Sequence, residues 1–263
     1  LERWTKLGVR QAFRGYPCRR GAVERVALQL VLWPLWLRMR LLGKDAKALP
    51  YRGRGRFVDV GCGTGQELAY QRGYGLAVVG IERSPSAARA AREQYGLDVR
   101  AGTLEEARLP ASSFDALYMS HVFEHLPDPA GTLREIHRIL DDDGLAILKV
   151  PNLASTCAKR FGACWLGLDL PRHLSHFTPE TLGALVRRHG FAVEAIRHDL
   201  GSWGFWRESR RVARVGRPGE SLGEGRWGNL RDKIMEAYAC WLRRGSVIVV
   251  YARRVTGQNA GSK

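Results

Sequence analysis

A glycine-rich segment and a carboxylate further along the chain are the first groups that could do chemistry. Residues 59–65 read Asp-Val-Gly-Cys-Gly-Thr-Gly and follow a short apolar run. Glycines between a strand and a helix allow a tight turn and let backbone N–H groups approach a ligand. Glu82 ends the next apolar run, where a carboxylate can reach the hydroxyls of a ribose. The plain alternative is a glycine turn that only packs a strand against a helix.

The spacing of these glycines narrows the class of ligand. Position 66 is Gln, so the spacing is Gly-x-Gly-x-Gly and differs from the Gly-x-Gly-x-x-Gly of dinucleotide sites. No Gly-Lys-Ser/Thr follows, which excludes a Walker phosphate loop. Neither a nicotinamide dinucleotide nor a Walker-bound nucleotide is therefore expected.

Three histidines form the second group. His125, His173 and His176 follow the fourth and fifth apolar runs, which is where ligands bind at the carboxyl edge of a parallel sheet. Imidazole suits a general base near neutral pH, and we rank these candidates in the order His173, His125, His176. The alternative for each is a hydrogen bond to backbone that fixes a loop. Arg172 could hold an acidic substrate group or form a salt bridge with Asp169.

Residues 121–125 match the H-x-x-E-H signature of a class of zinc proteases. That site needs a helix that carries both histidines on one face. Here the motif directly follows an apolar run and continues into Leu126-Pro127, which breaks a helix. The five cysteines are scattered and include no C-x-x-C pair, so neither a thiolate zinc site nor a disulfide framework is expected.

The elements that carry these residues alternate between strands and helices. Short apolar runs with turn residues at their ends predict seven strands, over 57–60, 77–81, 97–100, 114–119, 145–150, 191–196 and 246–251. Helical patterns lie at 86–95, at 129–140, ending before the turn Asp141–Gly144, and from Thr178-Pro179 to Gly190. This alternation predicts an α/β fold with a doubly wound, mainly parallel sheet.

In combination the motifs resemble class I S-adenosylmethionine-dependent methyltransferases of the bacterial branch that acts on small molecules and glycans. Residues 57–65 are similar to the first motif of that family, Val79–Glu82 to its second and Phe114-Asp115 to its fourth. The stretches 120–129 and 171–180 are similar to runs in its small-molecule and glycan-associated members. The resemblance covers about residues 55–197 and the last strand, and it implies a Rossmann-like fold with S-adenosylmethionine as the cofactor.

The resemblance also implies roles for individual residues. Asp59 and the backbone of residues 61–65 would hold the amino-acid part of the cofactor, and Glu82 would hold the ribose. Thr103 and Leu104 would flank the adenine. The full implied set of cofactor-binding residues is Asp59, Gly61, Cys62, Gly63, Gly65, Glu82, Arg83, Thr103, Leu104, Ser120 and His121. Some lipid-quinone O-methyltransferases of this fold bind a divalent cation through acidic and histidine residues of the 121–125 segment. His121 stands in the place of one of those acids, so no metal is predicted.

The division of the chain follows from this resemblance and from its charge. We expect a basic N-terminal helical segment or lid at 1–54, a cofactor-binding methyltransferase core at 55–197 and a helical insertion at 198–245. The last core strand is expected at 246–255 and a disordered tail at 256–263. Residues 1–56 hold 14 Lys and Arg against 3 Asp and Glu, and residues 201–263 hold 13 against 5, whereas the middle is near neutral. The alternative explanation for part of the net charge of +16 is a general preference for Arg over Lys.

The basic flanks suggest a partner. Val23–Leu42 combines Trp33 and Trp36 with arginines, as a helix that lies on an anionic membrane does; the alternative is a lid over the site. Its longest apolar run, Val26–Leu37, is too short to span a bilayer, which needs roughly 20 residues. No RNA-binding module or base-methylation motif is present, so no specific nucleic acid is expected. A cytoplasmic location is expected, with peripheral contact at the inner face of the membrane as an open alternative.

The predicted function is methyl transfer from S-adenosylmethionine to a hydroxyl of a small-molecule, glycan or lipid-linked acceptor. Two alternatives stay open at this point. One is C- or N-methylation of a natural-product intermediate, which needs less base catalysis. The other is a non-catalytic, S-adenosylmethionine-binding partner protein.

Overall fold

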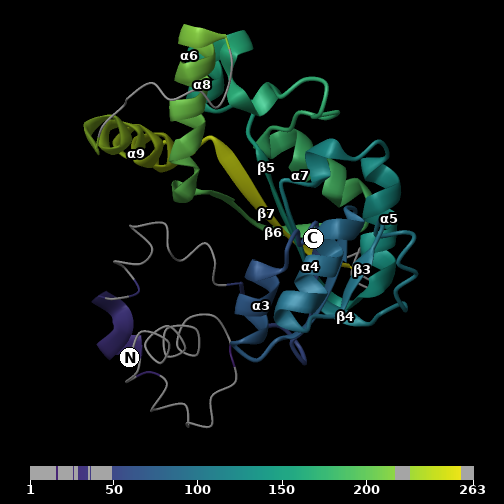
Figure 1. Cartoon of the computed structure of the whole chain (residues 1–263). Helices are drawn as coiled ribbons and strands as arrows, with labels where there is room; N and C mark the ends of the chain where they lie inside the picture. The colour runs from purple at the N-terminus through teal and green to yellow at the C-terminus, as the bar shows by residue number, and fades with distance from the viewer. Residues whose placement is uncertain are drawn as a thin grey trace.

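One seven-stranded sheet forms the centre of the molecule, in the order β3-β2-β1-β4-β5-β7-β6 (Figure 1). The computed structural model describes residues 49–216 and 226–255, together with residues 16, 26, 29–34 and 36. Neighbouring strands pair in parallel except β7, which runs antiparallel to both β5 and β6. The strands are β1 (Arg56–Val60), β2 (Ala77–Glu82), β3 (Val99–Ala101), β4 (Phe114–Ser120), β5 (Leu140–Pro151), β6 (Phe191–His198) and β7 (Val247–Arg254). The predicted doubly wound, mainly parallel sheet is confirmed.

Helices cover both faces of the sheet. The first and second, α3 (Gln66–Arg72) and α4 (Pro85–Tyr95), pack on one face with Phe57, Ala116 and Ile147. The helices α5 (Pro129–Ile139) and α7 (Pro179–Arg188) bury Leu133, Ile136, Leu182 and Val186 on the other face. Proline stands at the start of α4, α5 and α7 behind a Ser, Asp or Thr cap, as the sequence predicted for α7.

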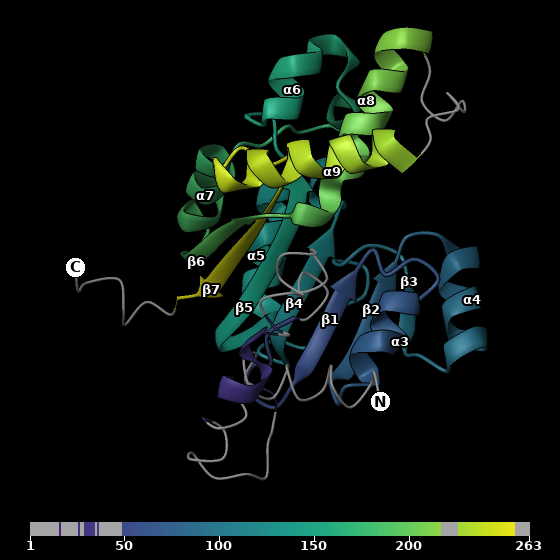
Figure 2. The same cartoon turned by 90° about the vertical axis from the view of Figure 1, so that its left-hand side faces the viewer.

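A third group of helices lies beyond the carboxyl ends of the parallel strands (Figures 1 and 2). It contains α6 (Thr156–Phe161), α8 (Gly204–Val215) and α9 (Arg226–Trp241), with short 3-10 turns η2 (Phe123–His125), η3 (Gly162–Cys164), η4 (Leu166–Leu168) and η5 (Leu200–Trp203). These helices have a small core of their own, built from Cys157, Ala158, Trp165 and Trp206. The structure therefore has a layer above the edge of the sheet where ligands bind.

Glu236 joins this layer to the sheet. Its carboxylate is fully buried on α9 and accepts hydrogen bonds from Trp206 Nε1 (2.7 Å), Ser246 N (2.7 Å) and Ser246 Oγ (2.6 Å). Trp206 lies on α8, and Ser246 comes directly before β7. Three donors on one buried carboxylate offset the cost of removing it from water. The carboxylate therefore fixes α8 and α9 to each other and to the start of the last strand.

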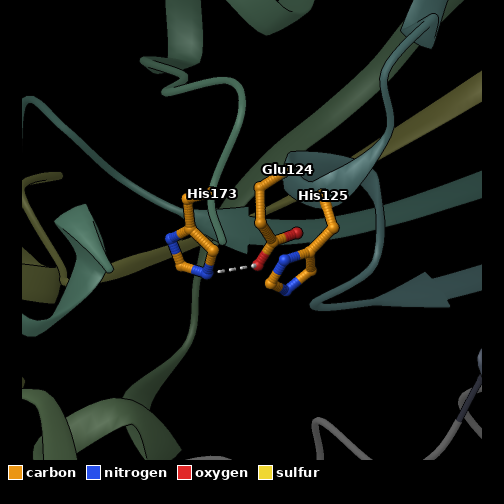
Figure 3. A group of neighbouring side chains, drawn as sticks. All are labelled: Glu124, His125 and His173. Atoms are coloured by element: carbon orange, nitrogen blue, oxygen red, sulfur yellow. Dashed lines mark ion pairs between the residues drawn. The ribbon is translucent and has the colours of Figure 1, made fainter. Parts of the chain in front are cut away.

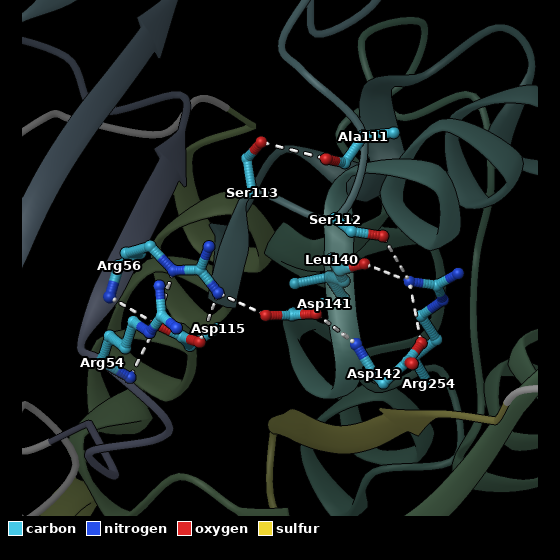
Figure 4. Close-up of polar contacts among 10 residues, drawn as sticks. All are labelled: Arg54, Arg56, Ala111, Ser112, Ser113, Asp115, Leu140, Asp141, Asp142 and Arg254. Atoms are coloured by element: carbon cyan, nitrogen blue, oxygen red, sulfur yellow. Dashed lines mark hydrogen bonds and ion pairs between the residues drawn. The ribbon is translucent and has the colours of Figure 1, made fainter.

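The start of β5 differs from the prediction. The sequence predicts a turn at Asp141–Gly144, but β5 already begins at Leu140, which pairs with Phe114 before a register irregularity. Arginines from other strands explain this result. Arg56 Nη2 lies 2.5 Å from an oxygen of Asp141 and 2.9 Å from one of Asp115, and Arg254 Nη1 lies 3.5 Å from Asp142 (Figure 4). Partners this far along the chain leave no trace in the local pattern.

The predictions for the chain's two ends fall mostly outside the described residues. The structure describes few of the positions on which three predictions rest. These predictions are the lid at 1–54, the membrane-surface helix at Val23–Leu42 and the tail at 256–263. Residues 29–34 are helical, and Leu30, Val31 and Trp33 are exposed. Within the described part of the chain, no helix combines the length and the apolarity that crossing a bilayer requires.

Candidate functional site

The carboxyl ends of β1, β2 and β4 bring most of the predicted cofactor-binding residues to one edge of the sheet. The glycine loop leaves β1 and leads into α3. Gly61 N donates to the carbonyl of Ile81 at 2.7 Å, which ties the loop to the end of β2. A cavity of about 350 Å³ opens beside the loop. Its lining includes Asp59, Gly61, Cys62, Glu67, Ser120 and Lys149.

Two glycines of the loop are required by close contacts. Gly61 has φ +80°, and a Cβ there would lie 2.3 Å from Val122 Cγ2, in the segment after β4. Gly65 also has φ +80°, and its Cβ would lie 2.8 Å from the Cβ of Ala91 on α4. L-residues with side chains rarely adopt such φ values. The first glycine lets the loop approach β4 closely, and the last lets α3 and α4 pack together.

Glu82 is hydrogen-bonded to the backbone of the glycine loop. Its Oε2 accepts from Gly63 N at 2.8 Å, and its Oε1 accepts from Ser84 N at 2.8 Å. Each carboxylate oxygen can accept more than one hydrogen bond. Glu82 can therefore hold the loop and still accept from two ribose hydroxyls, as the sequence predicts.

The predicted adenine contacts divide into surface and core positions. Thr103 is exposed, and its hydroxyl accepts from Glu106 N at 3.2 Å in a local turn. Leu104 is only 2% exposed and belongs to the core beneath α5, so its side chain is not available to a ligand. Arg83 is exposed next to Glu82. Only the backbone of Leu104 can therefore make the predicted contact with the adenine.

Asp59 gives the cavity an unusual electrostatic character. Burial, followed by repulsion from Glu67 and Glu82, raises the pKa of Asp59 from 3.8 to about 7. The same burial, together with Asp59, raises the pKa of the Cys62 thiol to about 12, so that thiol is neutral. A positively charged ligand group beside Asp59 would restore its ionised form. The cavity is therefore suited to an ammonium group.

Lys149 is the cation in the lining of this cavity. It lies near the carboxyl end of β5, beside Ser120 on β4, and its Nζ is 2.5 Å from Asp199 Oδ2. Asp199 is buried directly after β6. The sequence analysis missed both residues. A lysine inside the apolar run Leu-Ala-Ile-Leu-Lys-Val was the available signal, because a cation in a buried strand needs a partner.

The predicted histidines come together in a second cluster at the same edge. The rings of His125 and His173 lie 4.6 Å apart, and those of His173 and His176 lie 6.2 Å apart. Each ring uses one nitrogen on a backbone carbonyl: His125 Nδ1 on Arg172 O (2.9 Å), His173 Nδ1 on Gly167 O (2.8 Å) and His176 Nε2 on Leu168 O (2.9 Å). Within the described part of the chain, the Nε2 atoms of His125 and His173 have no carbonyl partner. Both are therefore available for chemistry.

Glu124 lies between these histidines (Figure 3). It is 1% exposed, and its Oε1 is 3.9 Å from His173 Nε2 and 3.2 Å from His121 Nδ1. Among the described residues, its Oε2 has no hydrogen-bond partner. His121 stacks on Phe205 of α8 with ring centroids 6.2 Å apart. Arg172 pairs with Asp169 at 2.8 Å, which is one of the two predicted alternatives.

Comparison with known proteins identifies the family. A family model described as a methyltransferase domain matches residues 37–196. The chain belongs to this methyltransferase family. It is a class I S-adenosylmethionine-dependent methyltransferase, and the predicted family and cofactor are confirmed.

Curated relatives of this methyltransferase include two proteins named ubiquinone biosynthesis O-methyltransferase. The one from Cereibacter sphaeroides is 31% identical over 153 residues, which cover 54% of this chain and 62% of the relative. The one from Xanthomonas axonopodis is 28% identical over 170 residues, 60% of this chain and 70% of the relative. The alignment thus spans less than two thirds of the first protein. Among solved structures, an S-adenosylmethionine-dependent methyltransferase from Mesorhizobium loti has a TM-score of 0.53 at 21% identity, covering 83% of this chain and 97% of its own.

Proposed function

We propose that this methyltransferase moves a methyl group from S-adenosylmethionine to a hydroxyl of a small-molecule, glycan or lipid-linked acceptor. The cluster of Glu124, His125 and His173 is the observation that supports a hydroxyl. A carbon or nitrogen nucleophile has less need of a group that removes a proton. Two relatives whose names specify O-methylation agree with this choice.

The cofactor is held, in this proposal, by charges of both signs. Asp59 and Glu67 take the ammonium group of its amino-acid part, and Lys149 takes the carboxylate. Glu82 accepts from the ribose hydroxyls. The cavity supports this arrangement because it combines Asp59, Glu67 and Lys149 in its lining. The sulfonium carries its own activating charge, so the protein mainly aligns the nucleophile with the methyl group and excludes water.

The histidines act on the acceptor. His125 is half-buried and His173 is 9% exposed, and both leave Nε2 directed away from their backbone partners. We therefore assign the activation of the acceptor hydroxyl to these two. His176 holds the loop through Leu168, and we assign it a positioning role.

The helices of the insertion close the site in this proposal. Phe205 of α8 contacts both His121 and Trp165, with ring centroids 6.2 and 6.4 Å apart. An aromatic cover above the transferred methyl group would keep water from the reaction. Residues 198–245 would thus be a lid and part of the acceptor pocket.

We also infer that α9 contacts an anionic membrane surface. Both acids of α9, Asp232 and Glu236, are buried, whereas Ile234, Tyr238 and Trp241 are 59%, 56% and 77% exposed. Exposed cations flank this apolar surface, at Arg231, Lys233, Arg243 and Arg244. An outward face with apolar residues and only positive charge fits lipid headgroups. Co-sedimentation with lipid vesicles tests this inference. We expect the protein to bind phosphatidylglycerol vesicles but not phosphatidylcholine vesicles, and the double variant Ile234→Ser/Trp241→Ser to lose this binding. Equal binding by the double variant and the unchanged protein contradicts the inference.

The proposed reaction is tested with methyl-labelled S-adenosylmethionine. The purified chain is offered a phenol that carries a short prenyl chain, a free sugar, a primary amine and an indole as the carbon nucleophile. We expect the label in a methyl ether. Label only on nitrogen or carbon, or no transfer to any acceptor by protein that binds the cofactor, contradicts the proposal. His125→Ala should lower turnover and leave binding of S-adenosylhomocysteine unchanged; loss of both together indicates a structural role instead.

A further inference from the structure

The insertion at 198–245 begins at an ion pair that also borders the cofactor cavity. Lys149 Nζ lies 2.5 Å from Asp199 Oδ2, and the two side chains are 21% and 4% exposed. Lys149 belongs to the lining of the cavity, whereas Asp199 does not. Among the described residues, Lys149 is the only cation paired with Asp199. The lysine therefore connects the cavity with the first residues of the insertion.

Asp199 holds the start of the insertion in place. It follows β6 directly and caps η5, since its Oδ1 accepts from Gly201 N at 2.9 Å. The turn η5 continues into α8. Trp203 of η5 contacts Arg207 of α8 and Lys233 of α9, whose cationic groups lie 5.3 and 5.2 Å from the ring centre. A change at Asp199 is therefore transmitted to both long helices of the insertion.

Asp199 is ionised, and its charge acts on the cavity. Burial alone would raise the pKa of Asp199, but attraction to Lys149 and the hydrogen bonds that Asp199 accepts keep this pKa below its ordinary value. Tyr118 is another residue of the cavity lining. Burial is the main cause that raises the pKa of Tyr118, and the negative charges of Asp59 and Asp199 raise it further. The charge of Asp199 therefore offsets part of the positive charge that Lys149 presents to a ligand.

A carboxylate that enters the cavity meets a lysine that is already paired. Like charges a few ångströms apart repel strongly at a partly buried site, so Asp199 weakens the attraction between Lys149 and a second anion. The function proposed above places the carboxylate of S-adenosylmethionine on Lys149, and the inference rests on that placement. Coupling between two such partners is reciprocal. The factor by which Asp199 weakens cofactor binding is also the factor by which the bound cofactor weakens the pair of Lys149 with Asp199.

We propose that Asp199 and the carboxylate of the cofactor compete for Lys149, so that binding of the cofactor loosens the start of the insertion. Asp199 is thus a positioning residue that acts on the cofactor through Lys149. The other attachment of the insertion, between Glu236 and Ser246, is not affected directly, because neither residue lines the cavity.

This competition sets an order of binding. In the cofactor-free protein, the pair of Lys149 with Asp199 keeps α8 in place, with Phe205 stacked on His121. Once the cofactor draws on Lys149, α8 can move away from His121 and expose the site of the acceptor. The cofactor would therefore bind first and the acceptor second.

Calorimetry with S-adenosylhomocysteine and methylthioadenosine tests the competition, because only the first compound carries the carboxylate. Asp199→Asn keeps an oxygen that can accept from Gly201 but removes the charge. It should bind S-adenosylhomocysteine about fivefold or more tightly and leave the affinity for methylthioadenosine unchanged. Glu208→Gln is the matched control, since Glu208 pairs with Arg211 on α8 and lies outside the cavity lining. It should bind both compounds as the unchanged protein does.

Hydrogen exchange of the unchanged protein tests the effect on the insertion without any variant. The complex with S-adenosylhomocysteine should exchange the amides of residues 200–206 several-fold faster than the complex with methylthioadenosine. In Asp199→Asn this difference between the two compounds should vanish.

The proposal is overturned if folded Asp199→Asn binds S-adenosylhomocysteine no more tightly than the unchanged protein, or if both compounds change the exchange of residues 200–206 equally. Failure of the unchanged protein to bind either compound contradicts the proposed cofactor site as well, so the two failures are distinguishable. No methyl transfer is measured, and the nature of the acceptor does not enter the result.

Discussion

Replacing Asp59 by Asn should stabilise the ligand-free protein at neutral pH. Burial and the neighbouring Glu67 and Glu82 raise the pKa of Asp59 from 3.8 to about 7. The folded state therefore holds the proton more tightly than the unfolded state, and the unfolded state binds fewer protons between about pH 4 and 7. In that window stability falls as pH rises, and the loss is complete above the folded pKa. About three pKa units, at about 1.4 kcal/mol each, correspond to about 4 kcal/mol.

Urea unfolding between pH 5 and 8.5 measures this effect. The free energy of unfolding of Asp59→Asn, minus that of the unchanged protein, should grow by roughly 2–3 kcal/mol from pH 5 to 7 and then stay level. Asp98→Asn is the control, because Asp98 is exposed and lies outside the cavity. The reasoning is refuted if the difference between Asp59→Asn and the unchanged protein does not depend on pH.

Asp59→Asn should also weaken cofactor binding, because it removes the carboxylate that we assign to the cofactor's ammonium group. A charge-assisted hydrogen bond to the cofactor's ammonium group contributes about 1.5–3 kcal/mol. Calorimetry at pH 8 should therefore show binding of S-adenosylhomocysteine weakened roughly tenfold or more. Unchanged affinity would mean that Asp59 does not contact the ammonium group.

Three further substitutions and one control variant examine the cavity and the insertion. Lys149→Met should weaken S-adenosylhomocysteine roughly tenfold but leave methylthioadenosine, which has no carboxylate, unchanged in calorimetry; equal losses would contradict the assignment. Gly61→Ala should abolish binding of both compounds, because its Cβ would lie 2.3 Å from Val122 Cγ2. Gly75→Ala, also at positive φ but with no atom near its Cβ, should bind both normally. Glu236→Ala should lower the free energy of unfolding by about 3 kcal/mol or more in urea, since it leaves buried donors unpaired; a change below about 1 kcal/mol would count against the described network.

The sequence predicted most of the sheet because buried parallel strands leave local apolar runs. The run at 57–60 and the run at 114–119 match β1 and β4 to within one residue. The start of β5 was predicted wrongly, since three aspartates in a row look like a turn until Arg56, Arg253 and Arg254 are known to meet them. Helix α6 was missed because it spans only 6 residues, too few to show a period.

The two parts of the site differ in how far they could be predicted. The glycine loop and Glu82 belong to one strand–helix–strand unit, so their spacing alone indicated a shared ligand. The pairing of Lys149 with Asp199, and that of Glu124 with His173, joins segments about 50 residues apart. Such pairs depend on which strand ends meet at the edge of the sheet. Residue types suggested His173, but only the fold brings its Nε2 to within 3.9 Å of Oε1 of Glu124.

The clamp formed by Glu236 limits how a new acceptor preference could be engineered. Its carboxylate accepts hydrogen bonds from Trp206 on α8 and from Ser246 directly before β7. A grafted α9 without that carboxylate would leave the backbone N–H of Ser246 buried and unpaired directly before β7, and this loss would destabilise the pairing of β7 with β5 and β6. An exchange between related proteins should therefore replace residues 199–246 as one unit. We expect chimaeras in which a single helix is replaced to misfold.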